Sequence, residues 1–253
     1  MAPYCTNPDQ PSISRLIGAI LLFGPLLSGQ SAIPVTTIEE KIVTLHELQH
    51  QVPRAARVEM AKGCEDMLKH RRDQAIQHLT KAVRIDPEYV QARNNLAVSL
   101  IREDPEAAIA QLKSAIDIDP HMAFLYYNLA ITYLSLKRLE DAERAARFSV
   151  GLDRTNTRMR TLLGIVLALE QKYTVEALAD LEPGRQQYPV AGMLAARVLI
   201  DHDQLGKARL YVNEYLSSSD QAFRQEAENW LHYIDRNLAK SAAVPIASLA
   251  APQ

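Results

Sequence analysis

Two histidines and a glutamate stand at a spacing that can support metal chemistry. The string is His46-Glu47-Leu48-Gln49-His50. On a helix, residues four apart share one face, so His46 and His50 would hold a zinc ion and Glu47 would act as general base on its bound water. A zinc metallopeptidase centred on these residues is therefore one hypothesis for the chain.

The context that a zinc peptidase needs is missing around this string. Such a site takes a third protein ligand, and the nearest candidates, Glu65 and His70, belong to a later helical segment. We therefore interpret His46 and His50 as solvated histidines and keep metal binding by them as an alternative. Elsewhere the sequence has no nucleophile–base pair, phosphate-binding loop or cofactor motif. We predict no catalytic residue, no cofactor and no enzymatic activity.

These histidines fall in a segment that the sequence predicts to be helical. Thr36–Gln51 has a capping threonine at its start, glutamates in its first turn and Pro53 just beyond its end. Apolar residues recur at helical spacing, as at Ile38 and Ile42, and form one narrow stripe. We assign residues 33–55 to an N-terminal capping helix.

Residues 123–156 predict two amphipathic helices joined by a short polar turn at Leu136-Lys137-Arg138. The core-facing residues are Tyr126, Leu129, Ala130 and Tyr133 in the first helix, and Leu139, Ala142, Ala146 and Ser149 in the second. Because a single hairpin of this kind cannot bury both faces of its helices, it needs copies of itself on either side.

The chain supplies these copies at a period of ~34 residues. Ile85-Asp86-Pro87 closes one copy and Ile118-Asp119-Pro120 closes the next, where proline ends one helix and suits the start of another. This pattern of Leu-Ala or Leu-Gly, Tyr, Ala and Asp-Pro resembles the tetratricopeptide repeat. The resemblance implies an all-α, right-handed superhelical solenoid of helix hairpins with a C-terminal capping helix. The predicted solenoid, 56–221, consists of units 56–89, 90–122, 123–156, 157–191 and a degenerate 192–221.

The resemblance also implies where a partner binds. In this family the first helix of each hairpin lines a concave groove that holds an extended peptide or a partner helix. Asn95 and Asn128 match a groove asparagine of the family, whose amide can both donate and accept a hydrogen bond. The predicted partner-binding residues are Asn94, Asn95, Val98, Phe124, Tyr127, Asn128, Ile131 and Arg158.

One subfamily clamps the terminal carboxylate of its partner with lysines, asparagines and an arginine, and this chain departs from that pattern. Asn94 and Val98 stand where its lysine and first asparagine would be, and Leu162 replaces its last arginine. We therefore do not expect recognition of an acidic C-terminal tail. Phe124 and Tyr127, together with Val98, instead favour a peptide with apolar anchors.

The first 32 residues have the layout of a secretory signal peptide. An apolar run follows Arg15 and ends at Ser28-Gly29, with small residues after it. The run is short for a membrane span of ~20 residues and contains Gly24-Pro25. We predict export to the periplasm or beyond the cell, with an uncleaved N-terminal membrane anchor as the alternative.

Residues 222–240 predict one amphipathic helix that caps the solenoid, followed by a disordered tail at 241–253. Trp230 lies on its apolar stripe, so an alternative is a dimerisation helix and a structural self-assembly subunit. The single cysteine beyond the leader, Cys64, is predicted to be a small buried apolar residue.

The charge balance bears on the class of partner. The chain has 28 Lys+Arg against 30 Asp+Glu, a net charge of −2, and no basic block with interleaved aromatics. This argues against nucleic acid as the main partner. The sequence therefore predicts a non-catalytic protein-binding scaffold of the cell envelope that binds a protein or peptide.

Overall fold

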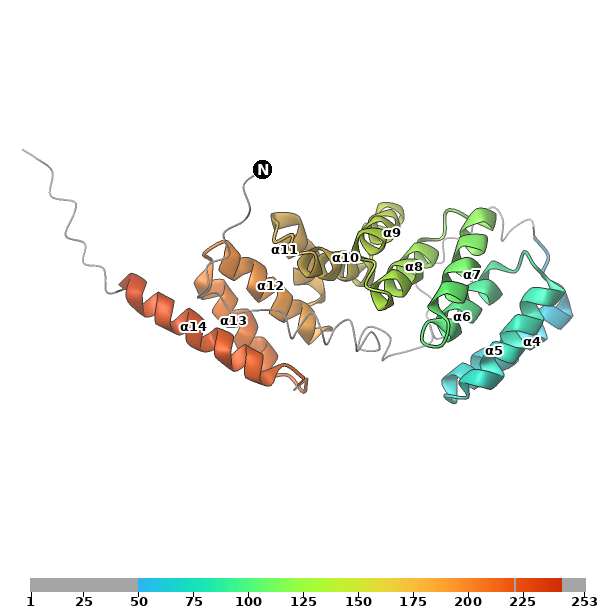
Figure 1. The fold of residues 1–253 in the computed structure, drawn as a ribbon, viewed down its shortest axis with the longest axis horizontal. Helices are drawn as coiled ribbons and strands as arrows, with labels where there is room; N and C mark the ends of the chain where they lie inside the picture. Colours follow the sequence, from blue (N-terminus) through green and yellow to red (C-terminus); the bar gives the residue numbers. More distant parts are fainter. Residues whose placement is uncertain (1–49, 221, 243–253) are drawn as a thin grey trace, which may run out of the picture. The chain divides into compact units, whose positions relative to one another are not determined.

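The computed structural model describes residues 50–220 and 222–242, and all regular structure within them is helical (Figure 1). The predicted leader, His46, Glu47 and most of the C-terminal tail lie outside the described residues. The helices are α4 (Arg54–Leu68), α5 (Arg72–Ile85), α6 (Val90–Leu100), α7 (Pro105–Ile118), α8 (Ala123–Ser135), α9 (Leu139–Leu152), α10 (Thr157–Leu169), α11 (Val175–Leu181), the short η1 (Glu182–Gly184), α12 (Pro189–Asp201), α13 (Leu205–Leu216) and α14 (Arg224–Ala242).

The chain divides into two compact units, with the boundary between Met159 and Arg160. In the first unit, α4 pairs with α5, α6 with α7, and α8 with α9, and each hairpin packs on the next through α5–α6 and α7–α8 contacts. In the second unit, α12 pairs with α13, and α14 packs on α13. The α12–α13 hairpin begins at Pro189, before the first residue of the predicted unit 192–221.

Small residues set the close approach of paired helices. Ala130 and Ala142 are fully buried where α8 and α9 meet. A Cβ atom on Gly63 would lie 2.6 Å from the Leu79 side chain of α5. On Gly164 it would lie 2.9 Å from the backbone nitrogen of Leu181. Such distances leave no room for a larger side chain, so the alanine and glycine positions of the sequence pattern are packing positions.

Four of the turns that join paired helices use the same backbone motif. Each places one non-glycine residue in the left-handed region, with φ between 55° and 59°. In the α8–α9 turn, the Lys137 N–H donates to Leu134 and the Arg138 N–H donates to Tyr133, which is the Schellman pattern. The four left-handed residues are His70, Lys137, Gln171 and Asp203.

The α6–α7 turn is built differently. Asp104 caps α7 by accepting from the Ala107 N–H at 2.9 Å, and Pro105 takes the first helical position. This is the helix start that Asp104-Pro105-Glu106 favours, because proline has no N–H to leave unpaired there.

One prediction about the ends of the described region is corrected. The helix predicted for Thr36–Gln51 does not reach its predicted end, since residues 50–53 are not helical and α4 begins at Arg54. Trp230 is 1% exposed, so its indole is core of the second unit and offers no surface anchor for a dimer. Trp230 belongs to the apolar stripe of α14, the helix that packs against α13 of the same chain.

Candidate functional site

The first helices of the first unit form one wall. Besides packing within hairpins, α4 contacts α6 and α6 contacts α8, whereas the second helices α5 and α7 lie further apart. A stack whose first helices approach more closely than its second helices curves toward the first helices. This side therefore carries the predicted partner-binding residues of α6 and α8.

A chain of amide groups runs between these helices. The Asn128 Nδ2 donates to Asn94 Oδ1 at 2.7 Å, and both side chains are buried. Asn94 and Asn95 are joined by a longer contact of 3.4 Å. The Asn95 Nδ2 then lies 3.3 Å from the sulfur of Cys64 on α4. Asn95 and Asn128 thus reach back to the preceding first helix and connect successive repeats.

This geometry changes which side chains are available to a partner. Tyr127 is 6% exposed and meets Phe124 edge-to-face, with ring centroids 6.4 Å apart. Asn94 and Asn128 are similarly buried, and sequence reasoning missed their bond because it depends on the neighbouring repeat. Five of the eight predicted residues are half-buried: Asn95 and Val98 on α6, Phe124 and Ile131 on α8, and Arg158 on α10.

Neighbouring hydroxyls are occupied within their own helices. Ser99 Oγ donates to the Asn95 carbonyl at 2.9 Å, and Thr132 Oγ1 donates to the Asn128 carbonyl at 2.7 Å. Each follows its asparagine by four residues. The chemistry that the predicted residues of this wall offer is therefore apolar and amide.

Cys64 behaves as a packing residue. It is free of any disulfide and half-buried, and burial raises the pKa of its thiol above the usual value, although the Asn95 hydrogen bond lowers it somewhat. A thiol with a raised pKa has little thiolate at neutral pH. This favours the structural interpretation of Cys64.

His50 is the one described residue of the metal-like string. It lies before α4 in a non-helical segment, with its Nε2 2.8 Å from Asp86 Oδ2 and its Nδ1 3.4 Å from Glu88 Oε2. The zinc geometry requires both histidines on one helical face, and the backbone at His50 does not continue a helix. Over residues 50–220 and 222–242, no group of three potential metal ligands comes together.

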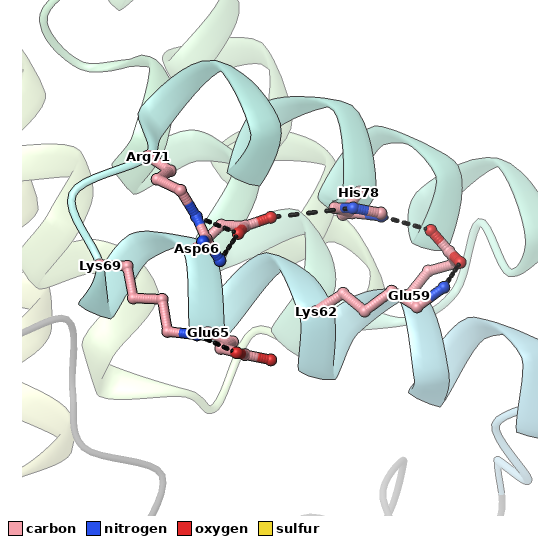
Figure 2. A network of polar contacts seen from close by, with 7 residues as sticks. All are labelled: Glu59, Lys62, Glu65, Asp66, Lys69, Arg71 and His78. Atoms are coloured by element: carbon pink, nitrogen blue, oxygen red, sulfur yellow. Dashed lines mark hydrogen bonds and ion pairs between the residues drawn. The ribbon is translucent and has the colours of Figure 1, made fainter.

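A second polar cluster joins α4 to α5 (Figure 2). His78 Nδ1 lies 2.7 Å from Glu59 Oε2, and its Nε2 lies 3.7 Å from Asp66 Oδ2. Asp66 also accepts from Arg71 Nε at 2.8 Å. Hydrogen bonds from His78 and then from Lys62 lower the pKa of Glu59 to about 2. The cluster fixes the hairpin and keeps Glu59 ionised.

In the part of the chain that the structure describes, no helix is long and apolar enough to cross a membrane.

Comparison with known proteins supports the repeat interpretation. Residues 99–164 match the model of the tetratricopeptide repeat family. No curated protein matches the chain at the sequence level. Among solved structures, PilF of Pseudomonas aeruginosa shares 21% identity at a TM-score of 0.60, covering 76% of this chain and 93% of its own.

Two further structures share the fold. PilW, described as a widely conserved type IV pilus biogenesis factor, has 19% identity and a TM-score of 0.60, covering 77% of this chain and 96% of its own. YrrB, described as a tetratricopeptide protein with an unusual peptide-binding site, has 18% identity and a TM-score of 0.55, covering 68% and 91%. The all-α hairpin fold is thereby confirmed, while the handedness of the superhelix stays a prediction. The repeated hairpins, the family match over residues 99–164 and the similar solved structures agree that the chain has the fold of tetratricopeptide repeat proteins.

Proposed function

We propose that this chain is a non-catalytic protein-interaction scaffold that binds an extended peptide or partner helix along the wall formed by α6 and α8. The observation that carries this proposal is the row of half-buried apolar and amide side chains on two adjacent first helices. Val98 of α6 and Phe124 and Ile131 of α8 belong to it. Half-buried apolar side chains lose water when a ligand covers them, which favours binding.

The partner's chemistry follows from this wall. Apolar side chains of the ligand would contact Val98 and Ile131, and Arg158 would attract an acidic group or chain terminus. The Asn95 Oδ1 accepts the long 3.4 Å contact from Asn94 and can accept a further hydrogen bond from a ligand N–H, whereas its Nδ2 is directed at the sulfurs of α4. The buried Asn128 and Tyr127 support the wall from behind and are not proposed as direct contacts.

We further propose that the scaffold works in the cell envelope after export. The support is the leader-like composition of residues 1–32, and PilF and PilW, which share the fold, include a type IV pilus biogenesis factor. An uncleaved leader would instead anchor the scaffold to the membrane. N-terminal sequencing of protein recovered from the envelope fraction distinguishes these two outcomes.

The groove proposal is tested with peptides selected on the wild-type chain from a random display library. Val98→Ser combined with Ile131→Ser should weaken their binding about tenfold or more, equivalent to about 1.4 kcal/mol, with the helical circular dichroism unchanged. Fluorescence anisotropy with labelled peptides measures the affinity.

A matched control removes apolar surface from the second helix of the third hairpin. Phe148 and Leu152 on α9 are 62% and 37% exposed, so Phe148→Ser with Leu152→Ser should leave peptide affinity unchanged. If this control abolishes binding while the Val98 and Ile131 pair does not, the partner surface lies on the second helices and the proposal is wrong.

A further inference from the structure

The α4–α5 hairpin carries a hollow on the face turned away from the next repeat. The contacts of α4 with α6 involve Met60 and Cys64, which lie near Asn95. Val58 is two residues before Met60 and therefore points to the opposite side of the helix. The hollow has a volume of about 590 Å³ and is lined by Arg54, Ala55, Val58, Glu59, Lys81, Arg84 and Ile85.

Its floor is apolar. Val58 is 45% exposed and Ile85 is 42% exposed, which is unusual for β-branched aliphatic residues on a packing face. In an array of stacked hairpins, this is the face on which a preceding hairpin would pack. Among the described helices, α4 and α5 pack on each other and on α6, and the Met60 and Cys64 contacts with Asn95 put α6 on the other side of α4.

Its rim is positively charged. Within the described residues, Arg54, Lys81 and Arg84 take part in no ion pair. Glu59, the one acidic residue of the lining, is bound by Lys62 at 2.9 Å and by His78 at 2.7 Å (Figure 2). An occupant that fits this hollow must therefore bring both apolar side chains and carboxylates.

The chain contains such a segment directly before the hairpin. Residues 36–49 contain apolar residues at helical spacing. They also contain three glutamates, Glu39, Glu40 and Glu47, and one lysine. His50, the next residue, is held at the end of α5 by its 2.8 Å contact with Asp86, which follows the lining residue Ile85. The segment therefore starts at the edge of the hollow, and this tether gives it a high effective concentration there.

We propose that residues 36–49 dock on the hollow of their own chain, with the Ile38 and Ile42 stripe on Val58 and Ile85 and the glutamates toward Arg54, Lys81 and Arg84. The docked segment closes the N-terminal end of the repeat stack in place of a further hairpin. It also shields an apolar and cationic surface that would otherwise attract acidic partners. This inference is independent of the proposed groove on α6 and α8.

The test is hydrogen–deuterium exchange of the full-length chain, read on peptides that cover residues 36–49. In the wild type these amides should exchange on the order of tenfold more slowly than in an unstructured peptide. Lys81→Glu with Arg84→Glu should remove this protection. Glu39→Lys with Glu47→Lys should remove it as well, and this pair leaves the hairpin itself untouched. Combining all four changes should restore a large part of the protection, because the charges are then exchanged.

Controls separate docking from other effects. Lys113→Glu with Arg154→Glu makes the same charge change at exposed positions away from the hollow and should leave residues 36–49 protected. Exchange in α4 and α5, followed in the same experiment, reports whether the hairpin is still folded. Because Glu39→Lys with Glu47→Lys does not alter the hairpin, it decides the result even if the Lys81 and Arg84 variant unfolds.

Three outcomes would overturn the proposal. One is exchange of residues 36–49 at the unstructured rate in the wild type. Another is protection that the charge reversals leave unchanged, which would place the segment elsewhere. The third is protection that rises with protein concentration, which would mean that the segment docks on a second copy. If residues 36–49 are unprotected and vesicles containing phosphatidylglycerol protect α4 and α5 instead, the hollow is a lipid-binding surface.

Discussion

Gly164 lies where α10 and α11 approach closely, and its missing side chain is a packing requirement. A Cβ there would lie 2.8 Å from Leu181 Cγ, 2.9 Å from the Leu181 backbone nitrogen and 3.1 Å from the Ala177 carbonyl oxygen. Two of these neighbours are backbone atoms, which cannot rotate away. We expect Gly164→Ala to destabilise the fold by roughly 1–3 kcal/mol through overpacking, despite the better helix propensity of alanine.

Gly151 is the matched control for this substitution. It also lies in a helix, but a Cβ there has no neighbour within 4 Å. Gly151→Ala should therefore leave the free energy of unfolding unchanged or raise it by up to about 1 kcal/mol. Urea unfolding followed by circular dichroism measures both variants, and equal effects would mean that propensity, not close packing, decides the Gly164 result.

The buried bond between Asn128 and Asn94 gives a second prediction at the level of single residues. Removing one partner leaves a buried amide without its hydrogen bond, so Asn128→Ala should destabilise by about 1–3 kcal/mol. Asn94→Ala combined with Asn128→Ala should cost less than the sum of the two single changes. A double-mutant cycle on unfolding free energies tests this, and strictly additive effects would show that the 2.7 Å contact contributes nothing.

These asparagines show which features of the site could be predicted from the sequence. Their position on the first helices followed from the repeat pattern, and α6 and α8 carry them where predicted. The orientation of their side chains could not be predicted from the repeat pattern. Each amide contacts the preceding repeat, and its direction depends on which side chain of that repeat lies opposite it. Asn94 supplies an oxygen acceptor for Asn128, whereas Met60 and Cys64 supply sulfur to Asn95. Asn94 and Asn128 are 34 positions apart in the sequence, so their contact can be recognised only once the repeats are stacked.

At the scale of elements, the hairpin turns carry avoidable backbone strain. Lys137 adopts φ of 59°, a conformation that disfavours residues with a Cβ by roughly 1–2 kcal/mol relative to glycine. Lys137→Gly should therefore raise the free energy of unfolding by a fraction of that amount, and Lys137→Val should lower it. Thermal unfolding of the two variants measures the difference.

The α6–α7 turn is the natural comparison for this prediction. None of the residues of this turn has a positive φ. Replacing the exposed Glu103 with glycine should therefore lower the free energy of unfolding. If Lys137→Gly and Glu103→Gly destabilise equally, the left-handed backbone at Lys137 is not the controlling factor.

Helix pairs were predictable from sequence because apolar spacing and Asp-Pro boundaries act locally. The left-handed residues were not, since His70, Lys137, Gln171 and Asp203 are of types that carry no strong turn preference, apart from the aspartate. Their common role appears only when the Schellman hydrogen bonds are compared between turns. The helix predicted for Thr36–Gln51 extended too far for a related reason, because its apolar stripe indicates a helix but not the residue at which it ends.

At the scale of the whole molecule, repeat proteins couple mainly between neighbours, so damage in one hairpin should stay local. Trp230 tests this idea because its side chain fills the core of the second unit beside α13. Trp230→Ala should destabilise that unit by about 3–5 kcal/mol. Hydrogen exchange should rise in α12, α13 and α14 and remain near its wild-type rate in α4 to α7.

The same variant decides between packing and self-assembly. If Trp230 were a dimer anchor, Trp230→Ala would lower the molar mass in light scattering and would leave the exchange of α12 and α13 unchanged. Because the indole is 1% exposed, we expect the opposite result, an unchanged mass and faster exchange next to α14. His232→Ala, on the exposed face of the same helix, should alter neither quantity. Equal acceleration of exchange from α4 to α14 would mean instead that the two units unfold as one cooperative body.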